Sequence, residues 1–294
     1  MDVGDLVDSI DCFKGTSNMV AVGCDEGKFA VLDIQKQTQI FEFMRDDALI
    51  GVKVADDNIV YSATEASIFK HDIREKNSGN LIFEAPSEIS DFAINDSVIA
   101  VATMSNDIIL TDKRILKKPQ SSPILPPVCN SLCFKNKDKI IAGYIDLSVG
   151  EWTLSSKKFQ SYKLSNQRQQ VNPAVVHCVA CQGNTVAAAT QNGLSIFVDG
   201  KIVASGNFEH EGAVHYITFA PCFSGKVTVS GGADGSLMVL DVEKMHVIDV
   251  IGNEEEKIQM ISANQNFVAV ADTSDSGSIG IFTPDDFTNH EEEQ

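Results

Sequence analysis

The segment that decides the fold runs from His210 to Asp241 and reads HEGAVHYITFAPCFSGKVTVSGGADGSLMVLD. Apolar residues alternate with polar ones in three short runs, centred on Ile217, Val229 and Val239, and this spacing predicts three β-strands. The tripeptide Ala233-Asp234-Gly235 separates the last two runs and is typical of a tight turn. The segment therefore predicts an antiparallel unit of about 40 residues once an outer strand is added.

This unit resembles the WD repeat of β-propellers. His210 stands where the family has its histidine, Ser230 where it has a hydroxyl and Asp234 where it has the turn aspartate, while Leu240 replaces the tryptophan. The resemblance implies that these side chains hydrogen-bond one another and fix the geometry of the blade. Ser, His and Asp also compose catalytic triads, but a structural network is the stronger interpretation here.

The same pattern recurs along the whole chain. First-strand candidates lie at spacings of about 40 to 45 residues, which is the period of WD repeats, and they centre on Ile10, Val52, Phe92, Leu132, Cys178, Ile217 and Met260. No window of helical length shows a 3.6-residue period. The prediction is an all-β, seven-bladed WD-type propeller. Residues 1–283 would form one domain, because no single blade can bury both of its faces, and residues 284–294 an acidic, disordered tail.

Two units depart from the four-strand pattern. The proline-rich stretch after Asp112 predicts that the third unit has a short outer strand or a loop there. Nothing strand-like follows Phe282, so the seventh unit lacks an outer strand, and residues 1–5 are the expected, short closure of the ring. Trp152, the only tryptophan, occupies the WD tryptophan position of the fourth unit.

Composition limits the class of protein. The 294 residues include 23 basic and 41 acidic side chains, for a formal net charge of −18. Direct nucleic-acid binding needs a basic surface, so the charge argues against it, although basic proteins such as histones or ribosomal proteins are compatible partners. No apolar run approaches the ~18 residues of a membrane span. The acidic N-terminus and seven scattered cysteines predict a cytoplasmic or nuclear protein with reduced thiols.

Arginine is scarce, and its placement is informative. Only four arginines occur, and Arg74 and Arg114 each follow by two residues an aspartate that ends a predicted third strand, Asp72 and Asp112. Residues two apart on a strand project to the same side. The planar guanidinium fork suits bidentate recognition, which lysine cannot supply. Either these pairs form a binding edge, or each arginine only pairs with its own aspartate.

The spans 59–74 and 99–114 resemble the sixteen-residue box of WD proteins that serve as substrate receptors for cullin-4 RING ubiquitin ligases. In that family the terminal arginine and an internal aspartate help engage the propeller adaptor of the ligase. Glu65 stands at the internal acidic position of the first box, and Ser105 at that of the second. The resemblance implies an adaptor site that comprises Glu65, Asp72, Arg74, Asp112 and Arg114, with the first box as the better match.

Three further stretches, 172–177, 181–184 and 193–197, resemble the corresponding part of the WD repeat-containing protein 53 family, as does the last unit around 255–257 and 268–272. That family is regarded as cullin-4 substrate receptors without enzymatic activity. The second Asp-x-Arg pair, which ends at Arg114, departs from the family pattern.

The remaining motifs predict no cofactor and no metal. Cys178 and Cys181 form a C-x-x-C motif, but residues three apart on a strand face opposite sides, so buried thiols are a better interpretation than zinc ligands. Histidines show no metal-binding spacing, and there is no glycine-rich phosphate loop. The sequence thus predicts a non-catalytic, monomeric interaction platform: a cullin-4 substrate receptor that binds the adaptor and a client, or a scaffold subunit of a chromatin or ribosome-assembly complex.

Overall fold

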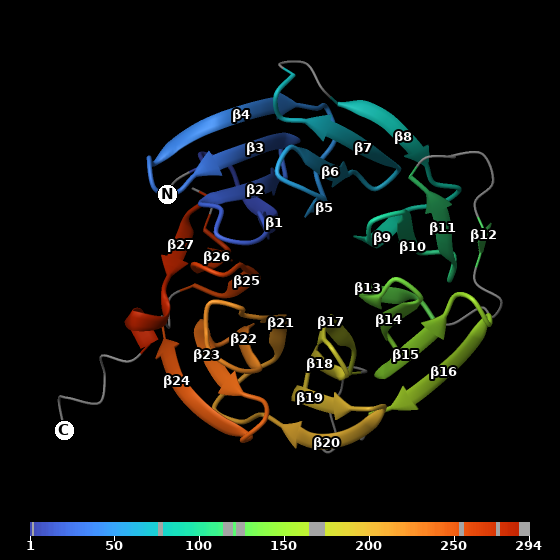
Figure 1. Cartoon of the computed structure of the whole chain (residues 1–294), viewed down its shortest axis with the longest axis vertical. Coiled ribbons are helices and arrows are strands. Elements are labelled where there is room, and N and C mark those ends of the chain that lie inside the picture. Colours follow the sequence, from blue (N-terminus) through green and yellow to red (C-terminus); the bar gives the residue numbers. More distant parts are fainter. Residues whose placement is uncertain are drawn as a thin grey trace.

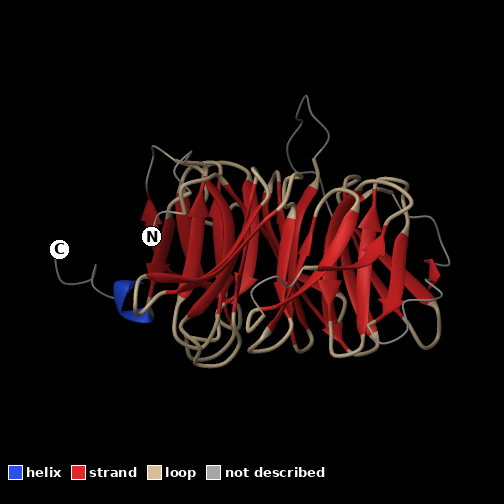
Figure 2. Ribbon diagram, turned by 90° about the horizontal axis from the view of Figure 1, so that it is seen from above, coloured by secondary structure: helices blue, strands red, loops and turns tan. Residues whose placement is uncertain are grey.

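Seven antiparallel sheets surround a central axis in a closed ring (Figure 1). The structure is a computed structural model, and it describes residues 1, 3–75, 79–113, 120–121, 127–164, 174–252, 256–274 and 277–287. Seen from the side, the strands run through the thickness of a disc and the loops gather on its two faces (Figure 2). The predicted seven-bladed β-propeller is confirmed.

Each blade is built outward from the axis. The inner strands are β1 (Val7–Cys12), β5 (Gly51–Val54), β9 (Ile89–Ile94), β13 (Cys129–Asn136), β17 (Val176–Gln182), β21 (Val214–Phe219) and β25 (Ile258–Ala263). The second strands are β2 (Met19–Cys24), β6 (Ile59–Ala63), β10 (Val98–Thr103), β14 (Lys139–Tyr144), β18 (Thr185–Thr190), β22 (Val227–Gly232) and β26 (Val268–Asp272).

The third strands are β3 (Lys28–Asp33), β7 (Ser67–Asp72), β11 (Ile108–Asp112), β15 (Ser148–Thr153), β19 (Gly193–Val198), β23 (Ser236–Asp241) and β27 (Ile279–Phe282). The outer strands are β4 (Thr38–Met44), β8 (Asn80–Glu84), β12 (Gln120–Ser121), β16 (Lys158–Lys163), β20 (Lys201–Gly206) and β24 (His246–Gly252). The sequence predicts a short outer strand or a loop in the third blade, and its described outer strand is two residues long.

Apolar side chains hold neighbouring blades together. Seven clusters of buried residues occur in the described part of the chain, one at each seam between consecutive blades. Some seams are so tight that glycine is required: a Cβ atom on Gly231 would lie 2.2 Å from Cγ2 of Ile258, and one on Gly143 would lie 2.5 Å from Cγ1 of Val176. The seams, rather than the individual sheets, therefore contain the core.

The inner strands are also connected by side chains, because each strand pairs through its backbone only within its own blade. The Ser9 hydroxyl accepts a hydrogen bond from the Val52 N–H at 2.9 Å, and the Ser131 hydroxyl accepts one from the Val179 N–H at 3.1 Å. In three further bonds, a backbone N–H of one inner strand donates to a side chain of the neighbouring one: Val54 to Asp11 (2.7 Å), Leu132 to Asp91 (2.6 Å) and Cys12 to Ser262 (2.9 Å). These bonds satisfy donors that no backbone group reaches.

Blade seven closes the ring with three strands, β25, β26 and β27. Met1 and Ile279 exchange two backbone hydrogen bonds of 2.7 Å, and the Val3 N–H donates to Gly277 O at 3.2 Å. Met1 and Val3 thus pair in antiparallel fashion with Ile279 and Gly277 at the start of β27, in the short closing position that the sequence predicts. The two ends of the ring meet at this seam (Figure 1).

The segment after blade seven differs from the prediction of a tail disordered from residue 284. Pro284–Phe287 forms a 3-10 helix, and Phe287 is buried. Its ring lies 5.6 Å from that of Phe223 and 5.8 Å from that of Phe282, so apolar burial orders this turn. The acidic residues 288–294 lie outside the described part.

Candidate functional site

The edge of blade two that the sequence predicts as a binding site carries a bidentate ion pair. Asp72 is the last residue of β7, and Arg74 follows in the next turn. Nε and Nη2 of Arg74 donate to the two carboxylate oxygens of Asp72 at 2.8 and 2.6 Å, and the Arg74 backbone N–H donates at 3.1 Å. These bonds lower the pKa of Asp72 to about 2. The Arg74 side chain is 65% exposed, so the remaining guanidinium edge faces solvent in a fixed orientation.

Strand-end aspartates in two other blades make comparable turns with lysine. The Asp33 carboxylate accepts bonds from the backbone N–H and the ammonium of Lys36, and Asp241 does the same with Lys244. Capping the turn is thus a shared role of these aspartates. Blade two differs in its cation, because a guanidinium presents several directed donors whereas an ammonium presents a point charge.

The other predicted adaptor residues are not brought to this edge. Glu65 lies in the turn between β6 and β7, while Asp72 ends β7 at the opposite face of the disc. A strand of this length separates them by about 20 Å. We call these the Glu65 face and the Arg74 face. Asp112 ends β11 on the Arg74 face, opposite Val98 in the ladder, and Arg114 lies outside the described residues.

The predicted network of blade six is assembled at the Glu65 face. His210 Nε2 lies 2.9 Å from the Ser230 hydroxyl, and its Nδ1 lies 3.4 Å from an Asp234 oxygen. Sequence reasoning missed Ser236, whose hydroxyl lies 2.8 Å from His210 Nδ1 and 2.7 Å from Asp234. Burial lowers the pKa of His210 despite the nearby Asp234 carboxylate. A neutral imidazole with hydroxyls at both nitrogens links the loop before β21 to Ser230 on β22 and to Ser236 at the start of β23.

This geometry resembles a hydrolase triad only in composition. Ser230 is 1% exposed and His210 is 3% exposed. The Ser230 hydroxyl points into the blade, where a substrate carbonyl has no access, and the nucleophile of a triad must reach its substrate. The network therefore acts on the blade itself.

The tryptophan position is used differently in blades two and four. In blade two it is His71, whose Nε2 lies 2.8 Å from the Ser62 hydroxyl, and the ring stacks 4.3 Å from Phe29. Blade two thus keeps the contact between the hydroxyl residue and the tryptophan position. Blade six lacks this contact, because Leu240 occupies its tryptophan position. Trp152 lies in blade four, where Ala142 replaces the hydroxyl residue, and its Nε1–H has no hydrogen-bond partner among the described residues. Trp152 packs at a seam instead of completing a network.

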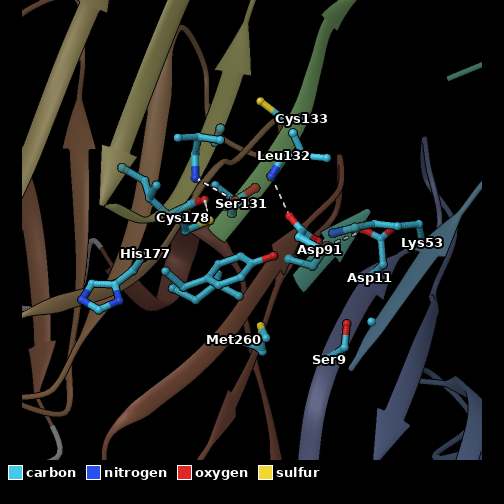
Figure 3. A pocket seen from close by; sticks show the side chains of 18 of the residues that line it. Ser9, Asp11, Lys53, Asp91, Ser131, Leu132, Cys133, His177, Cys178 and Met260 are labelled. Atoms are coloured by element: carbon cyan, nitrogen blue, oxygen red, sulfur yellow. Dashed lines mark hydrogen bonds between the residues drawn. The ribbon is translucent and has the colours of Figure 1, made fainter. Parts of the chain in front are cut away.

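The central channel is a polar concavity on the axis of the propeller. Residues from all seven inner strands line a cavity of about 540 Å³. Lys53 extends between Asp11 and Asp91 (Figure 3). Burial alone would lower the pKa of Lys53, but Tyr216 and the two carboxylates outweigh it and raise that pKa. Burial raises the pKa of Asp11 and Asp91, against the effect of Lys53.

The cysteines of the C-x-x-C motif face different neighbours. Cys178 Sγ approaches Ile217 O of blade six at 3.5 Å, whereas Cys181 Sγ lies 3.3 Å from Cys133 Sγ of blade four. Within the described ranges no group of three or more His, Cys, Asp or Glu side chains could hold a metal ion. All seven cysteines are free thiols.

No known family model matches this chain, and no curated protein matches it. The fold is consistent with a WD-repeat protein, and it defines the class: a β-propeller, a closed array of blades whose loops and edges serve as an interaction platform. No helix of the described chain is long and apolar enough to cross a bilayer.

Proposed function

We propose that this protein is a non-catalytic substrate receptor of a cullin-4 RING ubiquitin ligase, related to the WD repeat-containing protein 53 family and active in the cytosol or nucleus. The ligase adaptor would bind the Arg74 face at the edge of blade two. The observation that carries the proposal is the exposed Arg74 guanidinium, which Asp72 holds through two hydrogen bonds.

A preoriented arginine suits a docking role. Pairing with Asp72 removes rotamer freedom before a partner arrives, so less entropy is lost on binding. Arg45, by contrast, lies 3.2 Å above the ring of Phe69 and donates to Gly79 O, so it is engaged within its own seam. Arg74 is therefore the described arginine that is available to a partner.

The client would bind away from the adaptor. The Glu65 face and the channel remain open when a partner covers the edge at Arg74, because the two faces lie on opposite sides of the disc. The channel offers Lys53, Asp11 and Asp91 as polar contacts. Binding two partners on separate surfaces is what a substrate receptor requires.

The second candidate is a scaffold subunit that binds basic proteins. It is favoured by the net charge of −18, which attracts basic partners over long range. Such binding would weaken strongly as salt screens the charges. It would not depend on the shape of one guanidinium.

The decisive experiment is affinity purification of the wild type, Arg74→Ala, Arg74→Lys and Lys244→Ala, with detection of the ligase adaptor and a melting curve for each protein. Lys244 is the matched control, since it pairs with the strand-end Asp241 of blade six. We expect the wild type and Lys244→Ala to retain the adaptor. Both Arg74 variants should lose it at an unchanged melting temperature, because lysine restores the charge but not the fork.

Retention of the adaptor by Arg74→Ala contradicts docking at this edge. Absence of adaptor from every sample, together with basic partners that dissociate at high salt, assigns the protein to the scaffold class instead. Adding Arg114→Ala to Arg74→Ala tests whether the second Asp-x-Arg pair contributes.

A further inference from the structure

The outer edge of blade seven is only half covered. Because Ile279 exchanges both backbone bonds with Met1, its N–H and C=O point away from β26. Backbone groups of alternate residues on a strand point the same way, so the N–H and C=O of Ile281 also point outward. Met1–Val3 reach only the start of β27, and none of the described residues pairs with Ile281 along this edge. In Figure 1 no outer strand lies beyond β27.

Two hollows flank this open edge. On the blade six side, a cavity of about 120 Å³ lies beside Gly280 and is lined by the apolar side chains of Leu237, Ile251, Ile258, Val270 and Phe282. On the blade one side, a groove of about 540 Å³ includes Ile34, Phe267 and Ile281. In blade one, a side chain of the outer strand occupies the equivalent space: Phe41 is 7% exposed and fills the seam to blade two. The space for alternate side chains of a fourth strand is thus present.

The cavity on the blade six side has an acidic rim. Glu256 and Asp272 both line it, and their carboxyl groups are in hydrogen-bond contact. Two carboxylates this close repel each other when both are ionised, and a cation beside them relieves the repulsion. A lysine or arginine side chain matches both parts of the cavity, since its aliphatic stem is apolar and its end is charged.

We propose that the exposed edge of β27 is a docking site for an extended segment of a partner protein, which adds to blade seven as its fourth strand. The partner residue opposite Gly280 would be lysine or arginine, with its stem in the cavity and its charge at Glu256 and Asp272. The next residue, opposite Ile281, would be apolar and would cover the groove beside Ile34. The segment would exchange backbone hydrogen bonds with Ile281, as strands do when they extend a sheet edge.

This site goes beyond the adaptor proposal and does not depend on it. It uses blade seven, whereas the adaptor would use blade two. Arg74→Ala should leave binding at β27 unchanged, and a variant at Ile281 should leave adaptor binding unchanged. Failure of either proposal can therefore be recognised separately.

The test uses a short, fluorescently labelled peptide with a central lysine between two valines, added to the full-length protein and followed by fluorescence anisotropy. One matched peptide carries glutamate in place of the lysine. The other carries an N-methyl group on the amide of the valine that would pair with Ile281. We expect saturable binding of the lysine peptide with a Kd below about 1 mM. Binding should weaken at least about tenfold for each matched peptide, because one loses the charge match and the other a backbone bond.

Ile281→Pro is the informative protein variant. Proline at this position removes an outward N–H and no bond to β26, so the fold should tolerate it as edge strands do. We expect an unchanged melting temperature and at least about tenfold weaker peptide binding. The double variant Glu256→Gln/Asp272→Asn leaves the backbone edge intact and should abolish the preference for lysine over glutamate, which keeps the test valid even if the proline variant does not fold.

Several results would overturn the proposal. The lysine and glutamate peptides could bind equally well, Ile281→Pro could bind as tightly as the wild type, or no peptide could bind at all. A concentration-dependent dimer that Ile281→Pro abolishes, measured by sedimentation, would show instead that a second copy of this chain occupies the edge.

Discussion

At the scale of single residues, hydroxyl groups fix the geometry of blades two and six. Blade six holds His210 between Ser230 and Ser236, and blade two pairs Ser62 with His71. In blade four, where Ala142 replaces the hydroxyl residue, the Nε1–H of Trp152 lacks a partner within the described chain. A buried donor or acceptor without a partner costs more than the bond itself contributes. These networks are therefore sensitive to the loss of one oxygen.

Ser230→Ala should destabilise the protein by about 1–3 kcal/mol, because it leaves His210 Nε2 buried without its partner. Urea unfolding followed by circular dichroism measures the change. Ser224→Ala, in an exposed loop, is the matched control and should have little effect. Equal stability of the Ser230→Ala and Ser224→Ala proteins would show that the network contributes nothing.

A second prediction at this scale concerns pH. Burial lowers the pKa of His177, with the Gln191 contact at 3.1 Å opposing the shift. The unfolded chain, with a histidine pKa near 6.5, then binds more protons than the folded protein as the pH falls. The free energy of unfolding is therefore unaffected by the titration of His177 above about pH 6.5, and it falls as the pH drops below that value.

The wild type should therefore lose more stability than His177→Gln when the pH is lowered from about 7.5 to about 5.5. Asp11 and Asp91, whose pKa values are raised, act in the opposite direction but are present in both proteins. Urea unfolding at each pH gives the comparison. A steeper loss in the variant would contradict the sign of the shift.

At the scale of elements, the blades depend on one another through their seams. Gly231, the second-last residue of β22, contacts the side chain of Ile258 from β25, and Gly143 contacts Val176 in the same way. The sequence shows such glycines as ordinary strand residues, because the neighbour that requires them lies in the next blade. The absence of a side chain at these positions sets how closely two blades approach.

Gly231→Ala should destabilise the protein by about 1–3 kcal/mol, since the added methyl group overlaps Ile258. In a double variant with Ile258→Ala the clash is removed, so the combined cost should be smaller than the sum of the two single costs. Gly206→Ala, where nothing lies within 4 Å of the added Cβ, is the control. Additive costs in the double variant would contradict contact across this seam.

At the scale of the whole molecule, the ring must close between its first and last blades. Blade seven relies on Met1–Val3, and Val3 is packed with Ile279 in the cluster between blades seven and one. Asn264 also bridges this seam, donating to the backbone oxygens of Phe13 and Ser17. Contacts between residues about 250 positions apart in sequence thus complete the propeller.

Val3→Asp should destabilise the ring by about 1–3 kcal/mol, because a carboxylate replaces a side chain that is 6% exposed. Val203→Asp makes the same change on β20, where the side chain is 50% exposed, and should be close to neutral. Thermal unfolding of both variants measures the difference. Hydrogen exchange at Ile279 should increase only in the first variant.

Much of this molecule follows from local pattern. Strand positions, the number of blades, the shortened outer strand of blade three and the missing strand of blade seven are predictable, since period-two alternation and turn residues act over a few neighbours. The pairing of Asp72 with Arg74 is equally local. Adaptor binding by that pair stays a prediction of the sequence.

Only the tertiary structure decided which distant groups meet. It placed Glu65 and Arg74 on opposite faces, brought Lys53 between Asp11 and Asp91, and set Cys133 against Cys181. It also ordered the turn around Phe287 that composition alone predicts to be disordered. The physical reason is that these contacts form across seams and across the channel, where the geometry of the closed ring, not the spacing along the chain, determines proximity.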